Sequence, residues 1–175
     1  MSYTVGNMYD HTYAIAHGPQ DTRDRLDYTA EVDADATIYR GGICSLNSSG
    51  KFVAGCGAGT TTNYVIPMIA TGSTEYPDTK QPTYSGFVGK LNALVVTAGM
   101  EIETTEYVST STYHIGDAVV PGATTNAAKI DISTEAVYAN TKPILGFISM
   151  TPTAGKAYNV NAIRFWTCFF PAARA

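Results

Sequence analysis

The sequence has few charged residues and no long apolar run, and each shortage excludes a class of protein. Charged residues make up 15% of the 175 residues, and apolar residues make up 45%. Since an average globular protein is about 25% charged, this balance excludes a disordered polymer. The densest apolar run, 162–170, contains Arg164 and is about half as long as a membrane-spanning helix. We therefore expect no insertion into a membrane.

Groups that carry catalysis or bind metals are also scarce. Three cysteines and three histidines show no zinc-site spacing and no His-Glu-x-x-His motif, so we expect reduced thiols in packed positions. No Gly-x-Ser-x-Gly elbow occurs, and GCGAGT at 55–60 lacks the Lys of a phosphate loop. Glu101 and Glu103 lie two positions apart, on the same face of one predicted strand. We interpret them as part of a solvated strand face rather than as a glycosidase pair. The sequence therefore predicts no enzyme, no cofactor and no metal.

Negative charge is concentrated at the start of the chain. Residues 1–35 contain seven acids and two arginines, whereas the rest contains eight acids and nine bases. Neither part has the dense basic stripe that binds phosphates, so nucleic acid is not expected as a partner. Residues 1–10 lack the basic start and apolar stretch of a signal peptide, which predicts synthesis in a cytoplasm.

The pattern from residue 37 onward predicts an all-β fold, because short β-prone runs alternate with Gly, Ser, Thr and Pro. The run 37–46, the turn residues 47–50 and the run 51–54 form a hairpin pattern. The run 64–70 contains Pro67, which places it at an edge or a bulge. Further runs lie at 87–97, 100–108, 117–120, 129–133, 143–150 and 162–170. We expect a sandwich or a small β-barrel over residues 37–175.

Residues 1–36 differ from this body, because they show no sustained apolar period and are interrupted by His17-Gly18-Pro19-Gln20. We interpret them as an extended N-terminal arm. Aromatic and arginine side chains dominate the energetics of interfaces. The candidate contacts to a partner are Tyr3, Tyr9, Tyr13, Arg23, Arg25, Leu26 and Tyr28. The alternative is that the segment adds a strand or two to the sheets of the body.

The run 162–170, AIRFWTCFF, is apolar on both faces of the predicted strand. Such a strand must be covered twice, either by a central place in the fold or by a neighbouring subunit. The candidates for an oligomer interface are Phe165, Trp166, Phe169 and Phe170. Packing in the core of the same chain is the alternative.

Several phrases of the body resemble those of tailed-bacteriophage capsid decoration (cement) proteins. They are IYRGGICSLNSSGKFVAGCGAG and VIPMIA at 38–70, HIGDAVVPG at 114–122, and KPILGFISMTPTAGKAYNVNAIRFWTCFFP at 142–171. In that family, similar phrases run through a strand, a Ser/Gly turn, Lys-hydrophobic-Val-Ala and a proline-bearing strand. A Gly-Asp before a strand and an aromatic terminal strand follow. The likeness covers about residues 37–171, and it implies a jelly-roll-like sandwich or a small β-barrel as the fold of the body.

The resemblance implies a structural virion protein that binds the outside of a phage capsid and bridges neighbouring capsomers, with an arm reaching over adjacent subunits. Its implied partners are the major capsid protein and further copies of itself, with a trimer as the expected oligomer and a dimer at twofold positions as the alternative. Its implied location is the capsid exterior, after synthesis in the host bacterial cytoplasm. A tail-fibre or receptor-binding adhesion module is the alternative function, although the chain has no glycine or heptad repeats of a fibre shaft.

Overall fold

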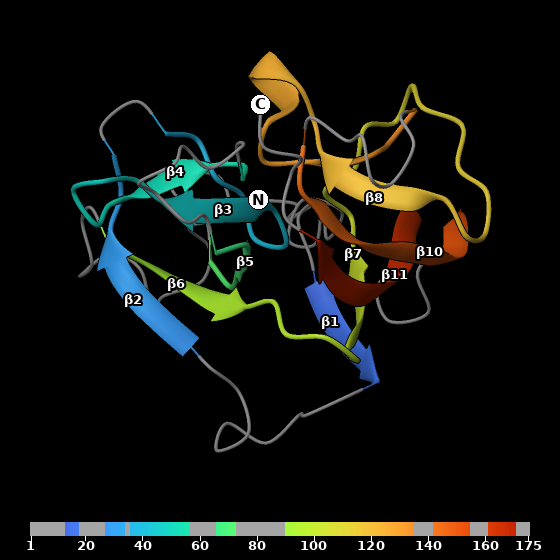
Figure 1. Cartoon of the computed structure of the whole chain (residues 1–175), viewed down its shortest axis with the longest axis horizontal. Helices are drawn as coiled ribbons and strands as arrows, with labels where there is room; N and C mark the ends of the chain where they lie inside the picture. The colour runs from blue at the N-terminus through green and yellow to red at the C-terminus, as the bar shows by residue number, and fades with distance from the viewer. Residues whose placement is uncertain are drawn as a thin grey trace, which may run out of the picture.

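The computed structural model describes residues 13–17, 27–33, 36–56, 66–72, 90–134, 142–154 and 161–170. Within these ranges the chain forms strands β1 to β11 and one short 3-10 turn, η3 (Thr124–Asn126). The strands make two antiparallel sheets (Figure 1), so the all-β prediction is confirmed. The described part of the chain holds no helix long and apolar enough to cross a membrane. The jelly-roll topology stays a prediction.

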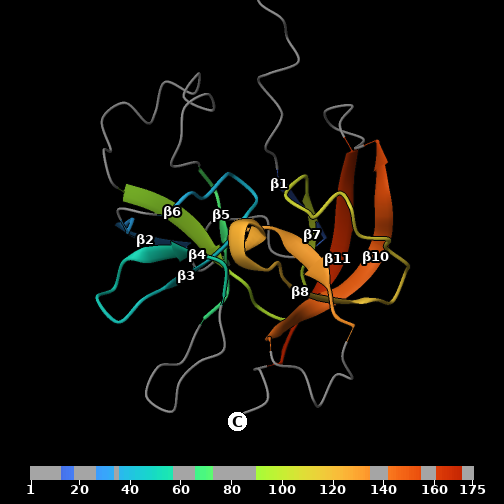
Figure 2. The same cartoon turned by 90° about the horizontal axis from the view of Figure 1, so that it is seen from above.

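The two sheets lie side by side, as the view from above shows (Figure 2). The six-stranded sheet has the order β1 (Tyr13–His17), β7 (Glu101–Thr104), β11 (Asn161–Phe170), β10 (Ile144–Ala154), β8 (Ala118–Pro121) and β9 (Ile130–Ile132). The five-stranded sheet has the order β2 (Asp27–Glu31), β6 (Lys90–Val95), β5 (Met68–Ala70), β3 (Ile43–Leu46) and β4 (Phe52–Ala54).

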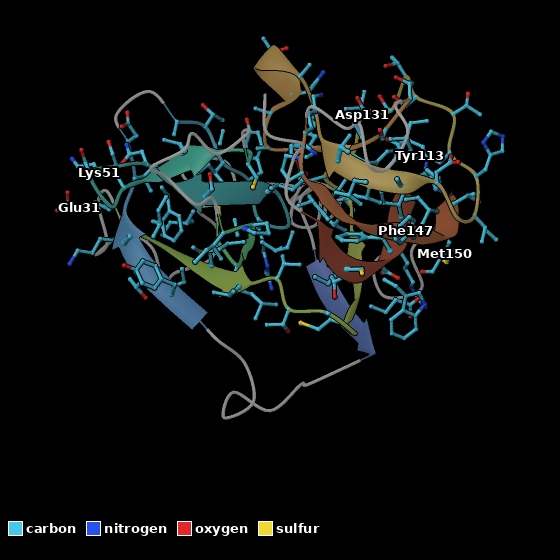
Figure 3. The ribbon with its side chains drawn as sticks, in the orientation of Figure 1. Glu31, Lys51, Tyr113, Asp131, Phe147 and Met150 are labelled. Carbon is cyan, nitrogen blue, oxygen red and sulfur yellow. The ribbon has the colours of Figure 1, made fainter. Side chains whose placement is uncertain are left out.

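The five-stranded sheet curls until its two outermost strands, β2 and β4, meet. Val32, just after β2, bridges Phe52, and the Asp33 N–H donates to the Phe52 carbonyl at 2.9 Å. The ring of Tyr28 lies edge-on to that of Phe52, with centroids 6.1 Å apart. At the same seam Lys51 Nζ lies 3.4 Å from Glu31 Oε2 (Figure 3). These contacts enclose an apolar interior, whose fully buried members are Ile38, Cys44, Phe52, Met68, Ala70, Leu91 and Ala93.

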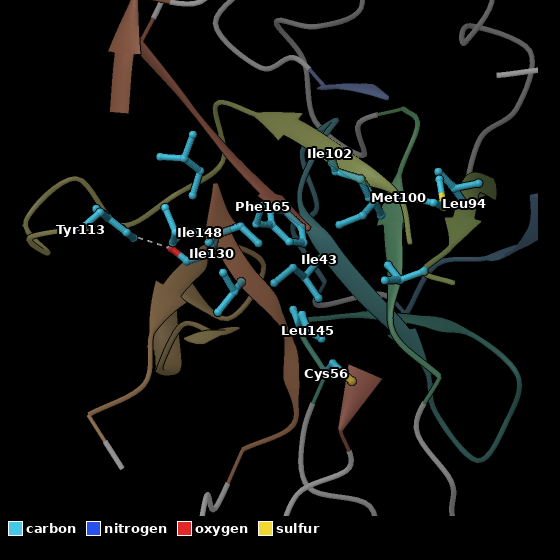
Figure 4. Packing of buried hydrophobic residues seen from close by; sticks show 14 residues of the cluster. Ile43, Cys56, Leu94, Met100, Ile102, Tyr113, Ile130, Leu145, Ile148 and Phe165 are labelled. Carbon is cyan, nitrogen blue, oxygen red and sulfur yellow. Dashed lines mark hydrogen bonds between the residues drawn. The ribbon is translucent and has the colours of Figure 1, made fainter. Parts of the chain in front are cut away.

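A second apolar core lies between the two sheets (Figure 4). Side chains alternate in direction along each strand, so the five-stranded sheet contributes to both cores. Cys44 points into the curled sheet, while its neighbour Ile43 points to the other sheet. Members from the five-stranded side include Ile43, Ile69 and Leu94; members from the six-stranded side include Ile102, Val119, Ile148, Ile163 and Phe165. Burial of this core fixes the two sheets against each other.

The hairpin predicted over 37–54 is confirmed, with Cys44 opposite Ala54 and Leu46 opposite Phe52. Its turn is closed by the Asn47 side-chain oxygen, which accepts from the N–H groups of Ser49 and Lys51.

The edge position predicted for the strand with Pro67 is wrong. The strand β5 lies in the middle of the five-stranded sheet, between β6 and β3. Pro67 comes just before the first strand residue, Met68, so the N–H that proline lacks falls outside the hydrogen-bonded ladder. Its carbonyl accepts from the Val96 N–H at 3.0 Å.

The described parts of residues 1–36 include a strand in each sheet. Strand β1 pairs with β7, and β2 pairs with β6. These stretches match the alternative in which the segment adds strands to the sheets of the body. An extended arm is not confirmed, and residues 1–12 and 18–26 lie outside the described residues.

Candidate functional site

Trp166 lies on the terminal strand β11, which is an inner strand of the six-stranded sheet. The neighbouring side chain, Phe165, is fully buried in the core between the sheets. Phe165 therefore serves the core of this chain, as the alternative interpretation held, and is not available to a partner. Trp166 points to the opposite face and is 43% exposed. The side chains of Phe169 and Phe170 lie outside the described ones.

Trp166 belongs to a row of facing residues that crosses four strands. It lies opposite Phe147 on one side and Glu101 on the other, and Phe147 in turn faces Ala118. A second row places Arg164 between Met150 and Glu103. Figure 3 shows Phe147 and Met150 close together on this side of the molecule.

We call this surface, turned away from the core, the outer face. Its described members include Glu101, Glu103, Ala118, Phe147, Met150, Arg164 and Trp166.

The two carboxylates of the outer face are buried, so the prediction of a solvated strand face for Glu101 and Glu103 is wrong. Arg164 Nε donates to Glu103 Oε2 at 2.6 Å. The Ser149 hydroxyl donates to Glu101 Oε1 at 2.5 Å. The strand register explains how Glu103 can be buried, because it places Arg164, the one cation of β11, opposite Glu103 of β7. Each acid therefore has a polar partner within the chain, as a buried carboxylate requires.

Of the candidate residues in the N-terminal segment, Tyr28 is the one whose side chain is described. It lies on β2 and is 44% exposed, with the edge of its ring against Phe52. Tyr13 is placed by the backbone register of β1, opposite Thr104 of β7. The other five, Tyr3, Tyr9, Arg23, Arg25 and Leu26, lie outside the described residues.

An exposed isoleucine, Ile115, was not singled out from the sequence. It is 74% exposed at the tip of the loop 111–117. The loop is held to β10, because the Gly116 N–H donates to the Ile148 carbonyl and the Ile148 N–H donates to the Asp117 carbonyl. The Asp117 carboxylate accepts from the His114 N–H at 2.7 Å. The signal in the sequence was Gly116-Asp117, a turn pair directly after an apolar residue.

The buried thiols act as packing groups, as expected for Cys44 and Cys56. Burial raises the pKa of Cys56 to about 12 and also raises the pKa of Cys44. Both are therefore protonated and weakly nucleophilic at neutral pH. Among the residues that the structure describes, no three His, Cys, Asp or Glu side chains gather as a metal site would require.

Comparison with known proteins identifies no relative: no family model, curated protein or solved structure matches this chain. The function is therefore argued from apolar side chains that the fold holds at its surface. Among the described residues they are Tyr28 on β2, Ile66 just before β5, Ile115 in the loop 111–117 and Trp166 on β11. Large apolar side chains in fixed positions are the usual anchors of protein interfaces.

Proposed function

We propose that this protein is a structural component of a tailed-phage virion that binds the outer surface of the capsid. It stabilises the shell by bridging neighbouring capsomers, and it does so as a homo-oligomer. Its partner is the major capsid protein, and it reaches the capsid exterior after synthesis in the host cytoplasm. The resemblance supports this proposal, since its phrases coincide with strands of both sheets: β3, β4 and β5 lie within 38–70, β8 within 114–122, and β10 and β11 within 142–171.

The observation that carries the proposal is the position of Tyr28. This tyrosine belongs to the acidic N-terminal segment and lies on β2, an outermost strand of its sheet. Contact with Phe52 fixes one side of its ring, while 44% of the residue stays exposed. An aromatic anchor that is ordered before binding loses little conformational entropy on contact with a partner.

Charge supports the same segment as the shell contact. Seven of the fifteen acids of the chain lie in residues 1–35. The proposal therefore includes a basic patch on the shell, which would steer the acidic segment toward it and make association sensitive to salt.

Co-sedimentation with empty shells, assembled from the major capsid protein encoded in the same genome, tests the proposal. We expect the full chain to sediment with the shells and to bind less tightly as salt rises. Tyr28→Ser should weaken binding about 10- to 30-fold, the loss typical of an interface hot spot. A chain lacking residues 2–12 should also bind less tightly, and this truncation leaves β1 and β2 intact.

Ile66→Ser is the matched control, because Ile66 is an exposed apolar residue near the start of β5 and outside the acidic segment. It should bind shells as the unaltered chain does. Circular dichroism of each variant checks that the β fold is retained. If Tyr28→Ser and the truncated chain bind as tightly as the full chain, the acidic segment is not the shell contact. If the full chain does not bind shells and is found at the tail tip, the adhesion function replaces this one.

A further inference from the structure

We infer that the outer face of the six-stranded sheet binds the side chain of an arginine from an extended segment of another protein. The guanidinium of that arginine lies on the ring of Trp166, and its positive charge faces the carboxylate of Glu101. The inference goes beyond the proposed function, because both residues lie outside the acidic segment 1–35 and the test needs no shell.

The first argument is the charge of the outer face. Its described members include two carboxylates, Glu101 and Glu103, and one cation, Arg164. Arg164 Nε donates to Glu103 Oε2 at 2.6 Å, so these two charges offset each other. The Ser149 hydroxyl donates to Glu101 Oε1 at 2.5 Å, but a neutral donor leaves the negative charge of a carboxylate in place. The charge of these members therefore favours a cationic ligand.

The second argument is the position of the indole beside this carboxylate. Trp166 is 43% exposed and lies directly opposite Glu101 in the register of β11 and β7. Residues that face each other on antiparallel strands have Cβ atoms about 4.5–5.5 Å apart. A cation is attracted to the face of an aromatic ring, and tryptophan attracts it most strongly. One bound cation can therefore interact with the ring and with the carboxylate together.

The third argument selects arginine among the cationic side chains. Phe147 lies opposite Trp166 on the side away from Glu101, so the carboxylate borders a surface made of two aromatic residues. A guanidinium is planar, stacks on aromatic faces and is weakly hydrated, whereas the ammonium of lysine is compact and strongly hydrated. The aromatic surface therefore favours arginine, which loses less hydration on contact with it.

The size of the face indicates one inserted side chain rather than a folded partner. Strands β7 and β8 have four residues each, which corresponds to about 13 Å of strand. Trp166 lies on β11, which has a neighbouring strand on both sides. A face this short is smaller than specific interfaces between folded proteins. It is long enough for one arginine and the residues that flank it in an extended segment.

The probe for this site is N-acetyl-arginine amide. N-acetyl-citrulline amide is the matched control, because citrulline has nearly the same shape without the charge. Trp166 is the single tryptophan of the chain, so tryptophan fluorescence reports on this site directly. We expect the arginine amide to change the emission with a dissociation constant of about 1 mM, as a ligand of about 15 non-hydrogen atoms allows. It should also protect the indole from quenching by acrylamide.

The controls test the charge and the shape of the ligand separately. The citrulline amide should bind at least about 10-fold more weakly than the arginine amide, because it lacks the cation. N-acetyl-lysine amide should also bind more weakly, because its ammonium is more strongly hydrated. Rising salt should weaken binding of the arginine amide.

Variants of the full chain separate the ring from the carboxylate, with binding followed by NMR signals of the ligand. Trp166→Leu keeps an apolar side chain without the ring and should weaken binding about 3- to 10-fold. Glu101→Gln keeps an acceptor for Ser149 without the charge, so binding should weaken and lose most of its salt dependence. Ile66→Ser removes an exposed apolar side chain outside the outer face and should bind as the unaltered chain does. Circular dichroism checks that each variant is folded.

Three results would overturn the inference. They are unchanged emission up to about 10 mM arginine amide, equal affinities for the arginine and citrulline amides, and a folded Trp166→Leu variant that binds as tightly as the unaltered chain. Sedimentation with shells is a separate measurement. A chain that binds the arginine amide but no shells would keep the inference and remove the proposed function, and a chain that binds shells but no arginine amide would do the reverse.

Discussion

Arg164 and Glu103 face each other on adjacent strands, with Nε 2.6 Å from Oε2 and both side chains largely buried. The pair lies on the outer face of the six-stranded sheet, among apolar neighbours. Its two members differ in one respect, because the long arginine side chain keeps more contact with water than the glutamate does. Loss of the arginine therefore leaves the more deeply buried charge without its partner.

Removing the cation should destabilise the protein strongly. We expect Arg164→Met to lower the free energy of unfolding by about 3 kcal/mol, because a buried carboxylate then lacks its counter-charge. The double variant Arg164→Met/Glu103→Leu should recover part of this loss, since no unpaired charge remains. Urea unfolding of the three chains gives the comparison. A double variant no more stable than Arg164→Met would show that the pair is not the source of the loss.

A glycine of β10 should tolerate no side chain. Gly146 is buried opposite Thr167, and a Cβ built on it would collide with the carbonyl oxygen of Trp166. We expect Gly146→Ala to cost about 3 kcal/mol, because backbone in a central strand cannot move aside cheaply. Gly99→Ala is the control, since Gly99 has open space around it and only its φ of 87° opposes a side chain. It should cost about 1 kcal/mol, as thermal unfolding would measure.

Stability should fall in alkaline solution because of the buried thiols. The folded pKa of Cys56 is raised to about 12, and that of Cys44 is raised as well. Unfolded thiols ionise first, so the stabilising effect is complete below about pH 8.5 and is lost as the pH rises toward 12. Between those limits, ionisation of each thiol in the unfolded chain should lower the free energy of unfolding by about 1.4 kcal/mol per pH unit.

Cys56→Ala tests this pH dependence. Its free energy of unfolding should decline less steeply with pH than that of the unaltered chain. Burial also raises the pKa of Tyr113, but this tyrosine is the same in both chains and does not affect the difference. Equal slopes between pH 9 and 11 would show that Cys56 is not protected from ionisation.

The seam of the curled sheet should depend on its aromatic contact and not on its ion pair. Phe52 fills the interior and meets Tyr28 across the seam, so Phe52→Ala should cost about 4 kcal/mol. The pair between Lys51 and Glu31 is exposed to solvent, so Lys51→Ala should cost less than about 0.5 kcal/mol. Chemical denaturation compares the two variants. Similar losses for both would mean that the exposed pair closes the sheet.

The parts of the fold that were predicted correctly are those encoded over short distances. The hairpin from Ile43 to Ala54 follows from two β-prone runs and the turn residues between them. The positions predicted wrongly depend on partners far away in the chain. Arg164 is 61 residues from Glu103, and alternation along one strand does not show which distant strand lies beside it. The central place of β5 likewise depends on its pairing with β6.

The placement of the candidate residues on β11 shows the same limit. Alternation placed Phe165 and Trp166 on opposite faces of one strand, but it did not show which face would meet the other sheet. The sequence shows no clear apolar period over the two strands within residues 1–36, β1 and β2. Both are outermost strands, and each pairs with a single neighbour in its sheet. Ile115 was missed because an apolar residue in a turn has no periodicity to mark it.

The position of β7 between β1 and β11 has a consequence for how the protein is made. The first and last strands of the described chain are both neighbours of the same strand, so this sheet cannot assemble while its last strand is still on the ribosome. Pairing between such distant segments is slow compared with local structure. We therefore expect folding to finish after synthesis ends, and chains that terminate early to be degraded rather than to enter an assembly as incomplete copies.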